Sequence, residues 1–289
     1  QACVRALDEE LGVKPEAETV LLFDRIRDGI PLPERSTHTV AGPTAPLLGR
    51  ERDLARLGRR LADPDVRLIT IGGLGGIGKT SLAREAGRQF SHDFADGAIF
   101  VSLVTAVEPS DVFPAIAAAA GLRLEPSSSP LTQVGNYLRS RELLLILDNF
   151  EHLTAGASLL IDLMAVAPHL VLLVTSRQRL NLSVEWLYEL RGLDFPAESA
   201  THPLAEFAAL QLFARRVRQE RGNFALVSSE ALAAADICRL VQGMPLAIEL
   251  AAAAAGVRST AEIARQLHVG LDALAVEWAD LPPRHRSLQ

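Results

Sequence analysis

The feature that most constrains this chain is a glycine-rich segment at residues 73–80, which has the sequence GLGGIGKT. An apolar run typical of a buried strand precedes it at residues 66–71, and a helix-like pattern follows at residues 80–90. Glycines allow successive backbone N–H groups to turn inward around an anion, and the N-terminus of the following helix adds a positive dipole. The segment therefore predicts a phosphate-binding loop between a strand and a helix.

The loop residues have separate expected roles toward a nucleotide. We expect Lys79 to reach the β- and γ-phosphates and to act in catalysis, and Thr80 to place its hydroxyl on Mg²⁺. The rest of the expected phosphate site consists of Gly73, Gly75, Gly76, Ile77, Gly78 and Ser81. The alternative is a flexible glycine-rich turn that binds nothing.

A second apolar run, residues 143–147, ends in Asp148. A buried parallel strand that ends in a carboxylate places this group at the C-terminal edge of the sheet, where ligands of open α/β sheets bind. We therefore expect Asp148 to be a Mg²⁺ ligand and a catalytic residue. The alternative is an aspartate that only forms a turn.

Two more charged residues are candidates for catalysis. Asn149 cannot act as a base, whereas Glu151 could orient or deprotonate the attacking water. Glu151 could equally be a carboxylate favoured at a helix N-terminus, and turnover would then be slow.

Arg177 follows the apolar run 171–174 and could bind a terminal phosphate by charge-assisted hydrogen bonds. A solvated surface arginine is the alternative for Arg177.

Strand-like and helix-like segments alternate between residues 47 and 195. This alternation predicts an α/β fold of the P-loop NTPase kind, with a mostly parallel sheet covered by helices. Beyond about residue 195 the strand pattern fades and only helical patterns follow, which predicts a smaller all-helical subdomain. The expected division is a helical tail of an upstream activation domain (1–29), a proline-rich linker (30–46), the nucleotide-binding core (47–195), the helical subdomain (196–281) and the start of a further domain (282–289).

Composition limits the partners that we expect. The formal net charge of −6 argues against strong nucleic-acid binding by the chain itself, although a local basic patch is compatible with it. Two cysteines, Cys3 and Cys238, cannot form a disulfide framework, which favours a cytoplasmic setting. No apolar run approaches the roughly 18–20 residues that span a bilayer, so we expect no membrane contact. Because the first residue is Gln1, we expect a fragment of a longer protein.

Five motifs occur in an order that resembles one family: LGRE (48–51), the loop at 73–80, LDNFEHL (147–153), TSR (175–177) and GMPLA (243–247). Together they are similar to the nucleotide-binding domain of STAND ATPases, the NB-ARC-like group of signal-transducing switches. The opening segment, residues 3–19, is similar to the end of the bacterial transcriptional activation domain in SARP-type regulators.

The resemblance implies roles for residues that the loop alone does not explain. It implies that ATP or ADP binds with Mg²⁺, that Arg50 packs near the adenine, and that Pro245 lines the adenine–ribose pocket. It also implies that Arg177 contacts the terminal phosphate. One departure concerns catalysis, because Asn149 stands where the family often carries a second acid. The other is that the winged-helix domain of relatives is only beginning at residues 282–289.

These motifs predict an ATP-hydrolysing regulatory switch within a transcriptional regulator. Exchange of ADP for ATP would permit self-association, and slow hydrolysis would reset the switch. DNA and RNA polymerase would be contacted only through domains of the parent protein outside this chain. The alternatives are a stand-alone P-loop ATPase or small-molecule kinase, and a nucleotide-binding module that does not hydrolyse ATP.

Overall fold

The structure is a computed structural model that describes residues 40, 47–197, 203–222, 225–226 and 228–269. The predicted helical tail (1–29), the last part of the expected helical subdomain (270–281) and the start of a further domain (282–289) lie outside these residues, as does the linker apart from Val40. No helix in the described stretches is long and apolar enough to cross a membrane.

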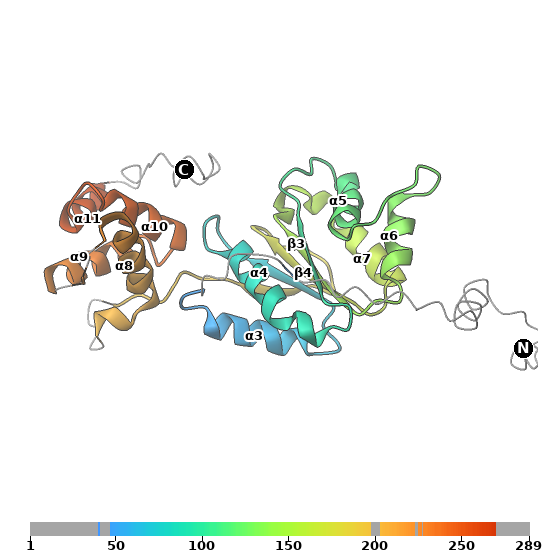
Figure 1. Ribbon diagram of the computed structural model, residues 1–289, viewed down its shortest axis with the longest axis horizontal. Coiled ribbons are helices and arrows are strands. Elements are labelled where there is room, and N and C mark those ends of the chain that lie inside the picture. The colour runs from blue at the N-terminus through green and yellow to red at the C-terminus, as the bar shows by residue number, and fades with distance from the viewer. Residues whose placement is uncertain (1–39, 41–46, 198–202, 223–224, 227, 270–289) are drawn as a thin grey trace, which may run out of the picture. The chain divides into compact units, whose positions relative to one another are not determined.

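Strands and helices alternate from residue 51 to residue 189 (Figure 1). The helices of this part are α3 (Glu51–Leu61), α4 (Lys79–Phe90), α5 (Val112–Ala119), α6 (Pro130–Leu138) and α7 (Ser158–Val166). The strands are β1 (Leu68–Gly72), β2 (Ala98–Ser102), β3 (Leu143–Asp148), β4 (Leu170–Ser176) and β5 (Trp186–Glu189). The later helices are α8 (Ala208–Arg221), α9 (Ser228–Leu240), α10 (Pro245–Ala254) and α11 (Thr260–Val269).

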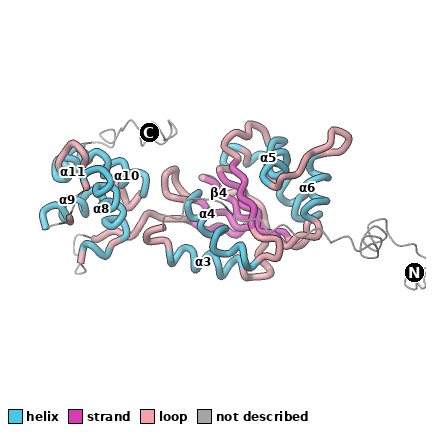
Figure 2. Tube along the Cα trace, viewed as in Figure 1, coloured by secondary structure: helices cyan, strands magenta, loops and turns pink. Residues whose placement is uncertain are grey.

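The five strands form one sheet in the order β2-β3-β4-β1-β5, and every neighbouring pair is parallel. Figure 2 shows the sheet in magenta, with helices around it. The predicted α/β fold with a parallel sheet is therefore confirmed. Strand β4 lies between β1 and β3, although it follows both in the sequence. The register pairs Leu147 with Val174, so the next residues, Asp148 and Thr175, lie side by side at the C-terminal edge.

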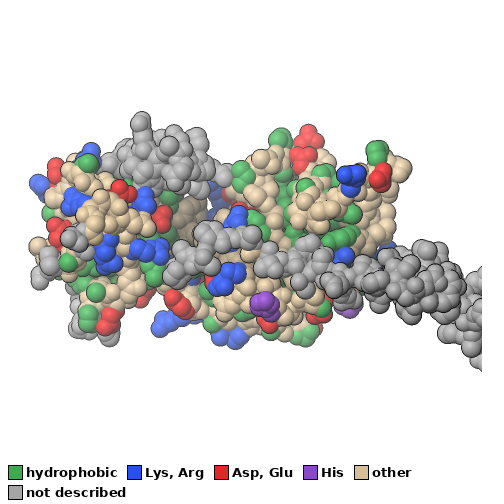
Figure 3. All heavy atoms as spheres, viewed as in Figure 1, with side chains coloured by type: hydrophobic (Ala, Val, Ile, Leu, Met, Phe, Trp, Pro, Cys, Tyr) green, Lys and Arg blue, Asp and Glu red, His purple; other side chains and the backbone are tan. Residues whose placement is uncertain are grey.

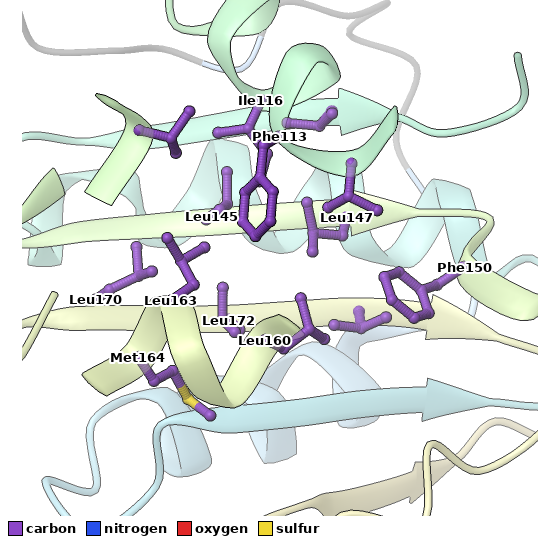
Figure 4. Packing of buried hydrophobic residues seen from close by; sticks show 14 of the residues in the cluster. Phe113, Ile116, Leu145, Leu147, Phe150, Leu160, Leu163, Met164, Leu170 and Leu172 are labelled. Atoms are coloured by element: carbon purple, nitrogen blue, oxygen red, sulfur yellow. The ribbon is translucent and has the colours of Figure 1, made fainter. Parts of the chain in front are cut away.

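Alternate residues of the strands face opposite sides of the sheet, as a strand period of two requires. Leu144 and Ile146 of β3 belong to the hydrophobic cluster beneath α3 and α4. Leu145 and Leu147 belong to the cluster beneath α5, α6 and α7. Figure 4 shows Phe113 of α5 directed toward these two leucines. Because both faces are covered, β3 is buried at every position and reads as a continuous apolar run.

Two elements of the core lack a strong sequence signal. Helix α6 begins at Pro130 after the cap Ser129, whose hydroxyl accepts a hydrogen bond from Thr132 N at 3.1 Å. Its polar residues and Gly135 make it look like a continuation of the preceding loop. Strand β5 has four residues, pairs only with β1 and is partly exposed, so the buried run that marks the other strands is absent.

Helices α8–α11 enclose a hydrophobic cluster of their own, which confirms the expected helical part after the sheet. Backbone hydrogen bonds connect this part with the core. Leu193 N donates to Gly243 O at 2.8 Å, and Leu246 N donates to Gly76 O at 3.2 Å. The domain boundaries expected at residues 46, 195 and 281 stay predictions.

Gly243 is expected to tolerate no side chain, because its φ is +66° and a Cβ there would lie 2.1 Å from Leu193 O. Gly121 has a similar φ, +69°, but a Cβ there would meet nothing within 4 Å. Backbone strain of about 1–2 kcal/mol therefore applies to both positions, and the clash adds about 1–3 kcal/mol at Gly243 alone. Urea unfolding should show Gly243→Ala to be the more destabilised variant. Equal losses in Gly243→Ala and Gly121→Ala would contradict the close approach of the two segments.

Candidate functional site

The glycine-rich loop connects the C-terminal end of β1 directly to the N-terminus of α4. Gly76 and Gly78 have φ values of +73° and +98°, which side-chain-bearing residues rarely adopt. Gly78 is the N-terminal cap of α4, and Lys79 is the first residue of this helix. The unpaired N–H groups and the positive dipole end of α4 therefore meet the loop, as an anion site requires.

Other parts of the chain also approach the loop closely. A Cβ on Gly76 would lie 2.8 Å from Cβ of Leu246, which belongs to α10. A Cβ on Gly75 would lie 3.2 Å from Nη2 of Arg177, which follows β4. Glycine is therefore needed here both for its conformation and for the space it leaves.

Lys79 is buried, and its ammonium group lies within the loop. Its Nζ donates to Gly73 O at 2.8 Å and to Leu74 O at 3.0 Å. Burial lowers the pKa of Lys79 below its ordinary value, while the nearby carboxylates of Glu151 and Asp148 act to raise it. An anion bound in the loop would compensate for the lost hydration of this group.

Asp148 at the end of β3 accepts two hydrogen bonds on the same carboxylate oxygen. Thr80 Oγ1 donates to Asp148 Oδ1 at 2.8 Å, and Thr175 Oγ1 donates to it at 2.7 Å. Thr175 Oγ1 in turn accepts from Asn149 N at 2.9 Å. The structure thus brings together the two residues predicted as Mg²⁺ ligands, and Thr175 positions one of them.

This pair of groups fits the coordination of a magnesium ion. Mg²⁺ is held by one or two protein oxygens, with water and phosphate oxygens completing its octahedral shell. The hydroxyl of Thr80 and the carboxylate of Asp148 supply two such oxygens within hydrogen-bond distance of each other. Within the described residues no three His, Cys, Asp or Glu side chains form a group that could hold a metal ion without help from a ligand. A magnesium ion here would therefore depend on nucleotide phosphates.

Glu151 and Arg177 form an ion pair at the rim of the site. Arg177 Nε lies 3.2 Å from Glu151 Oε1, and the arginine side chain is 56% exposed. The other oxygen of Glu151, Oε2, is buried and has no hydrogen-bond partner. Glu151 belongs to a short 3-10 helix, Phe150–His152. The pair therefore leaves one buried carboxylate oxygen unsatisfied, which commonly marks a site that completes its bonding with a ligand.

Arg50 is buried and connects two backbone segments. Its Nη2 donates to Ile77 O at 2.8 Å, and its Nη1 donates to Arg191 O at 2.8 Å. Nη1 also pairs with Asp53 Oδ2 at 3.2 Å. These bonds fix the loop to the segment after β5. The expected position of Arg50 near an adenine stays a prediction.

A pocket of about 210 Å³ lies over the loop. The predicted residues on its wall are Gly75, Gly76, Gly78, Lys79, Thr80, Ser81, Glu151, Arg177 and Pro245. Pro245 is the first residue of α10. A second pocket, of about 1140 Å³, is lined by the start of the loop (Gly73, Leu74, Ile77) and by Leu193 and Met244. Two pockets therefore adjoin the loop, and Arg177 lines both of them.

Sequence reasoning missed Glu249, which lies on α10 and lines the smaller pocket. Burial raises the pKa of its carboxyl, while Arg216 and Arg215 act to lower it. The available signal was a single acidic residue in the otherwise apolar sequence PLAIELAAAA of α10. An acid at such a position is costly to bury, so it indicates a role beyond packing.

Glu249→Gln is expected to stabilise the chain more at pH 7 than at pH 4. The pKa of Glu249 is higher in the folded chain than in the unfolded chain, because burial disfavours the charged carboxylate. The protonated carboxyl therefore contributes to the stability of the fold below the unfolded-state pKa. This contribution is lost as the pH rises through the folded-state pKa. Glutamine does not titrate and escapes this loss. Thermal unfolding of both proteins at the two pH values tests the difference, with exposed Glu262→Gln as control. An equal effect of Glu249→Gln at both pH values would contradict a raised pKa.

The parallel sheet, the loop before a buried lysine and the Thr80–Asp148 pair define a P-loop ATPase domain. Residues 65–193 match the model of the AAA domain family. The resemblance stated above from the motifs is confirmed, because the relatives include a putative HTH-type transcriptional regulator and the regulatory protein AfsR.

Three relatives illustrate this likeness. "Uncharacterized protein Rv0894" of Mycobacterium tuberculosis is 33% identical over 78% of this chain and 55% of its own length. "Putative HTH-type transcriptional regulator Rv0890c" of the same organism is 34% identical over 68% of this chain and 21% of its own length. The regulatory protein AfsR of Streptomyces griseus is 31% identical over 89% of this chain and 27% of its own length. The chain thus spans about half or less of the relatives that it matches.

Among solved structures, a chain in the Drosophila ORC complex bound to DNA has a TM-score of 0.54 and 16% sequence identity. The match covers 81% of this chain and 70% of that chain. At this identity the likeness concerns the fold, a P-loop core followed by helices.

Proposed function

We propose that this chain is the nucleotide-controlled switch module of a transcriptional regulator. The observation that carries the proposal is the contact of α10 with the phosphate loop, where Leu246 N donates to Gly76 O at 3.2 Å. A group bound in the loop would lie against both the α/β core and the helical part. The position of α10 would therefore respond to which nucleotide is bound.

The proposal assigns the nucleotide to the two pockets beside the loop. The phosphates would occupy the smaller pocket, where Lys79 binds them and Thr80 and Asp148 hold Mg²⁺. The adenine and ribose would lie against Pro245 and the segment that Arg50 fixes, with ATP and ADP as the ligands. The names of the relatives support regulation of transcription by the parent protein, in the cytoplasm, through DNA-binding domains elsewhere.

The Glu151–Arg177 pair provides a physical basis for a switch with slow hydrolysis. A γ-phosphate would compete with Glu151 for Arg177, because guanidinium binds both anions with paired hydrogen bonds. Glu151 would then be released to orient water, which Asn149 cannot deprotonate. ADP lacks the γ-phosphate and would leave the pair intact. The two nucleotides would thus favour different arrangements of the same residues.

The proposal is tested by titration calorimetry with ADP and with a slowly hydrolysed ATP analogue, followed by sedimentation velocity in each state. We expect different affinities for the two nucleotides and a larger sedimentation coefficient with the ATP analogue. Equal affinities with unchanged sedimentation would contradict a switch. Such a result, if both ligands bind tightly, would instead favour the non-hydrolysing module.

Turnover distinguishes the remaining alternatives. Glu151→Gln is expected to lower phosphate release from ATP by about 100-fold, the usual contribution of a positioned general base, while nucleotide affinity is kept. Exposed Glu262→Gln serves as control. Release that is already undetectable in the unaltered chain would favour the non-hydrolysing module. A phosphorylated small molecule in a substrate screen would favour a kinase.

A further inference from the structure

Helix α3 carries a stripe of arginines on the face turned away from the core. Arg52, Arg56, Arg59 and Arg60 are all exposed. At 3.6 residues per turn these positions fall within an arc of roughly 100°. The opposite face carries the buried residues Leu54, Leu57 and Leu61. Blue side chains of Lys and Arg lie at the lower edge of Figure 3, in the region where Figure 1 places α3.

Three of these arginines line a groove of about 410 Å³ between α3 and the edge strand β5. The opposite wall consists of Trp186, Leu187 and Tyr188. The guanidinium of Arg60 lies over the ring of Trp186, 4.3 Å from its centroid. We call this surface the α3–β5 groove.

The positive charge of the groove is not neutralised within the described part of the chain. None of the four arginines forms an ion pair there with an aspartate or glutamate. The acids on the same helix are Glu51 and Asp53, and Asp53 is shared by Arg50 and by the hydroxyl of Tyr188. The whole chain has a net charge of −6, so the positive charge of these four arginines runs against the overall balance. A surface of this kind attracts an anionic partner.

The geometry points to the phosphate backbone of duplex DNA as this partner, and we propose that the α3–β5 groove binds it. From Arg52 to Arg60 the stripe runs about 12 Å along the helix axis, and successive phosphates of one DNA strand rise by about 3.4 Å. Guanidinium groups bind phosphate oxygens bidentately. Because successive phosphates also rotate about the axis, the straight stripe can contact two or three phosphates of one strand without reading any base.

Two observations favour the duplex backbone over other anionic partners. Single strands are bound by stacking bases on aromatic rings, but one face of Trp186 is already covered by Arg60. A protein partner would bury apolar surface, yet Trp186, 41% exposed, is the one large apolar residue of the groove wall that is well exposed. The DNA contact would belong to this chain itself and would not require nucleotide exchange.

The experiment measures binding of the chain to a fluorescent 24-base-pair duplex by anisotropy at several salt concentrations. Each lost phosphate contact lowers the slope of log affinity against log salt by about 0.9. The triple variant Arg56→Ala, Arg59→Ala, Arg60→Ala should therefore bind at least tenfold more weakly in 50 mM salt and lose up to about 2.7 from the slope. The charge-matched control is Arg123→Ala, Arg139→Ala, Arg265→Ala, three exposed arginines elsewhere, and it should keep the slope.

A second measurement separates loss of contact from loss of folding. In a Trp278→Phe background, the fluorescence of Trp186 should change when duplex is added, and thermal unfolding should show that both triple variants stay folded. An unchanged slope in the Arg56, Arg59 and Arg60 variant would overturn the proposal. So would polyglutamate binding as tightly as the duplex with the same dependence on these arginines, which would assign the groove to an acidic protein.

Discussion

Lys79→Ala is expected to weaken the binding of ATP and ADP by about 100-fold or more. Nζ of Lys79 lies inside the loop, where it donates to Gly73 O and Leu74 O. From this position it can turn to a bound phosphate, and hydrogen bonds to charged groups contribute about 1.5–3 kcal/mol each. Loss of one or two such bonds in a site shielded from water corresponds to about one to four powers of ten in affinity.

The measurement is titration calorimetry with each nucleotide, and the matched control is Arg88→Ala. Arg88 is a cation on the same helix, paired with Glu85 on the exposed face. Arg88→Ala removes one positive charge, as Lys79→Ala does. It should lower the stability of the fold only slightly, since surface ion pairs contribute about 0–1 kcal/mol. If Lys79→Ala retained the affinity of the unaltered chain, the assignment of the loop as the phosphate site would be wrong.

Asp148→Asn is expected to abolish the dependence of ATP binding on Mg²⁺. Asparagine keeps a carbonyl oxygen that can accept the hydrogen bonds from Thr80 and Thr175, so the fold around β3 should survive. It lacks the negative charge that a hard divalent cation requires. Loss of even an outer-shell partner lowers metal affinity about 10–100-fold, and loss of a direct ligand should cost at least as much.

ATP titrations with Mg²⁺ and with EDTA measure this effect. In the unaltered chain EDTA should weaken ATP binding, whereas in Asp148→Asn it should change little. Asp162→Asn, an exposed substitution on α7, should behave like the unaltered chain. A full Mg²⁺ response in Asp148→Asn would place the metal ligand elsewhere.

Much of the fold was predictable because its signals are local. Strands β1, β3 and β4 are buried on both faces, and each therefore stands out as an apolar run. Strand β5 and helix α6 were not predicted. The edge strand β5 is partly exposed and needs no apolar run, and the short α6, interrupted by Gly135, packs against α5 and α7.

The candidate site was predictable for the residues that are adjacent to the loop or end a strand. Lys79 and Asp148 belong to this group. Glu249 does not, because its relevance depends on neighbours far away in the sequence. Glu249 shares a pocket with Lys79 only because α10 packs on Gly76. No local pattern of residues encodes such a contact.

The sequence by itself determined the phosphate loop, the alternation of strands and helices, and the carboxylate at the end of β3. These depend on backbone conformation and burial period, which act over a few residues. Only the tertiary structure decided that β4 lies between β1 and β3, which places Thr175 beside Asp148 and Arg177 beside Glu151. It also decided that β5 forms a groove with the arginines of α3. The physical reason is that strand order follows from packing apolar faces over long separations in the chain, and this leaves no signal within any one segment.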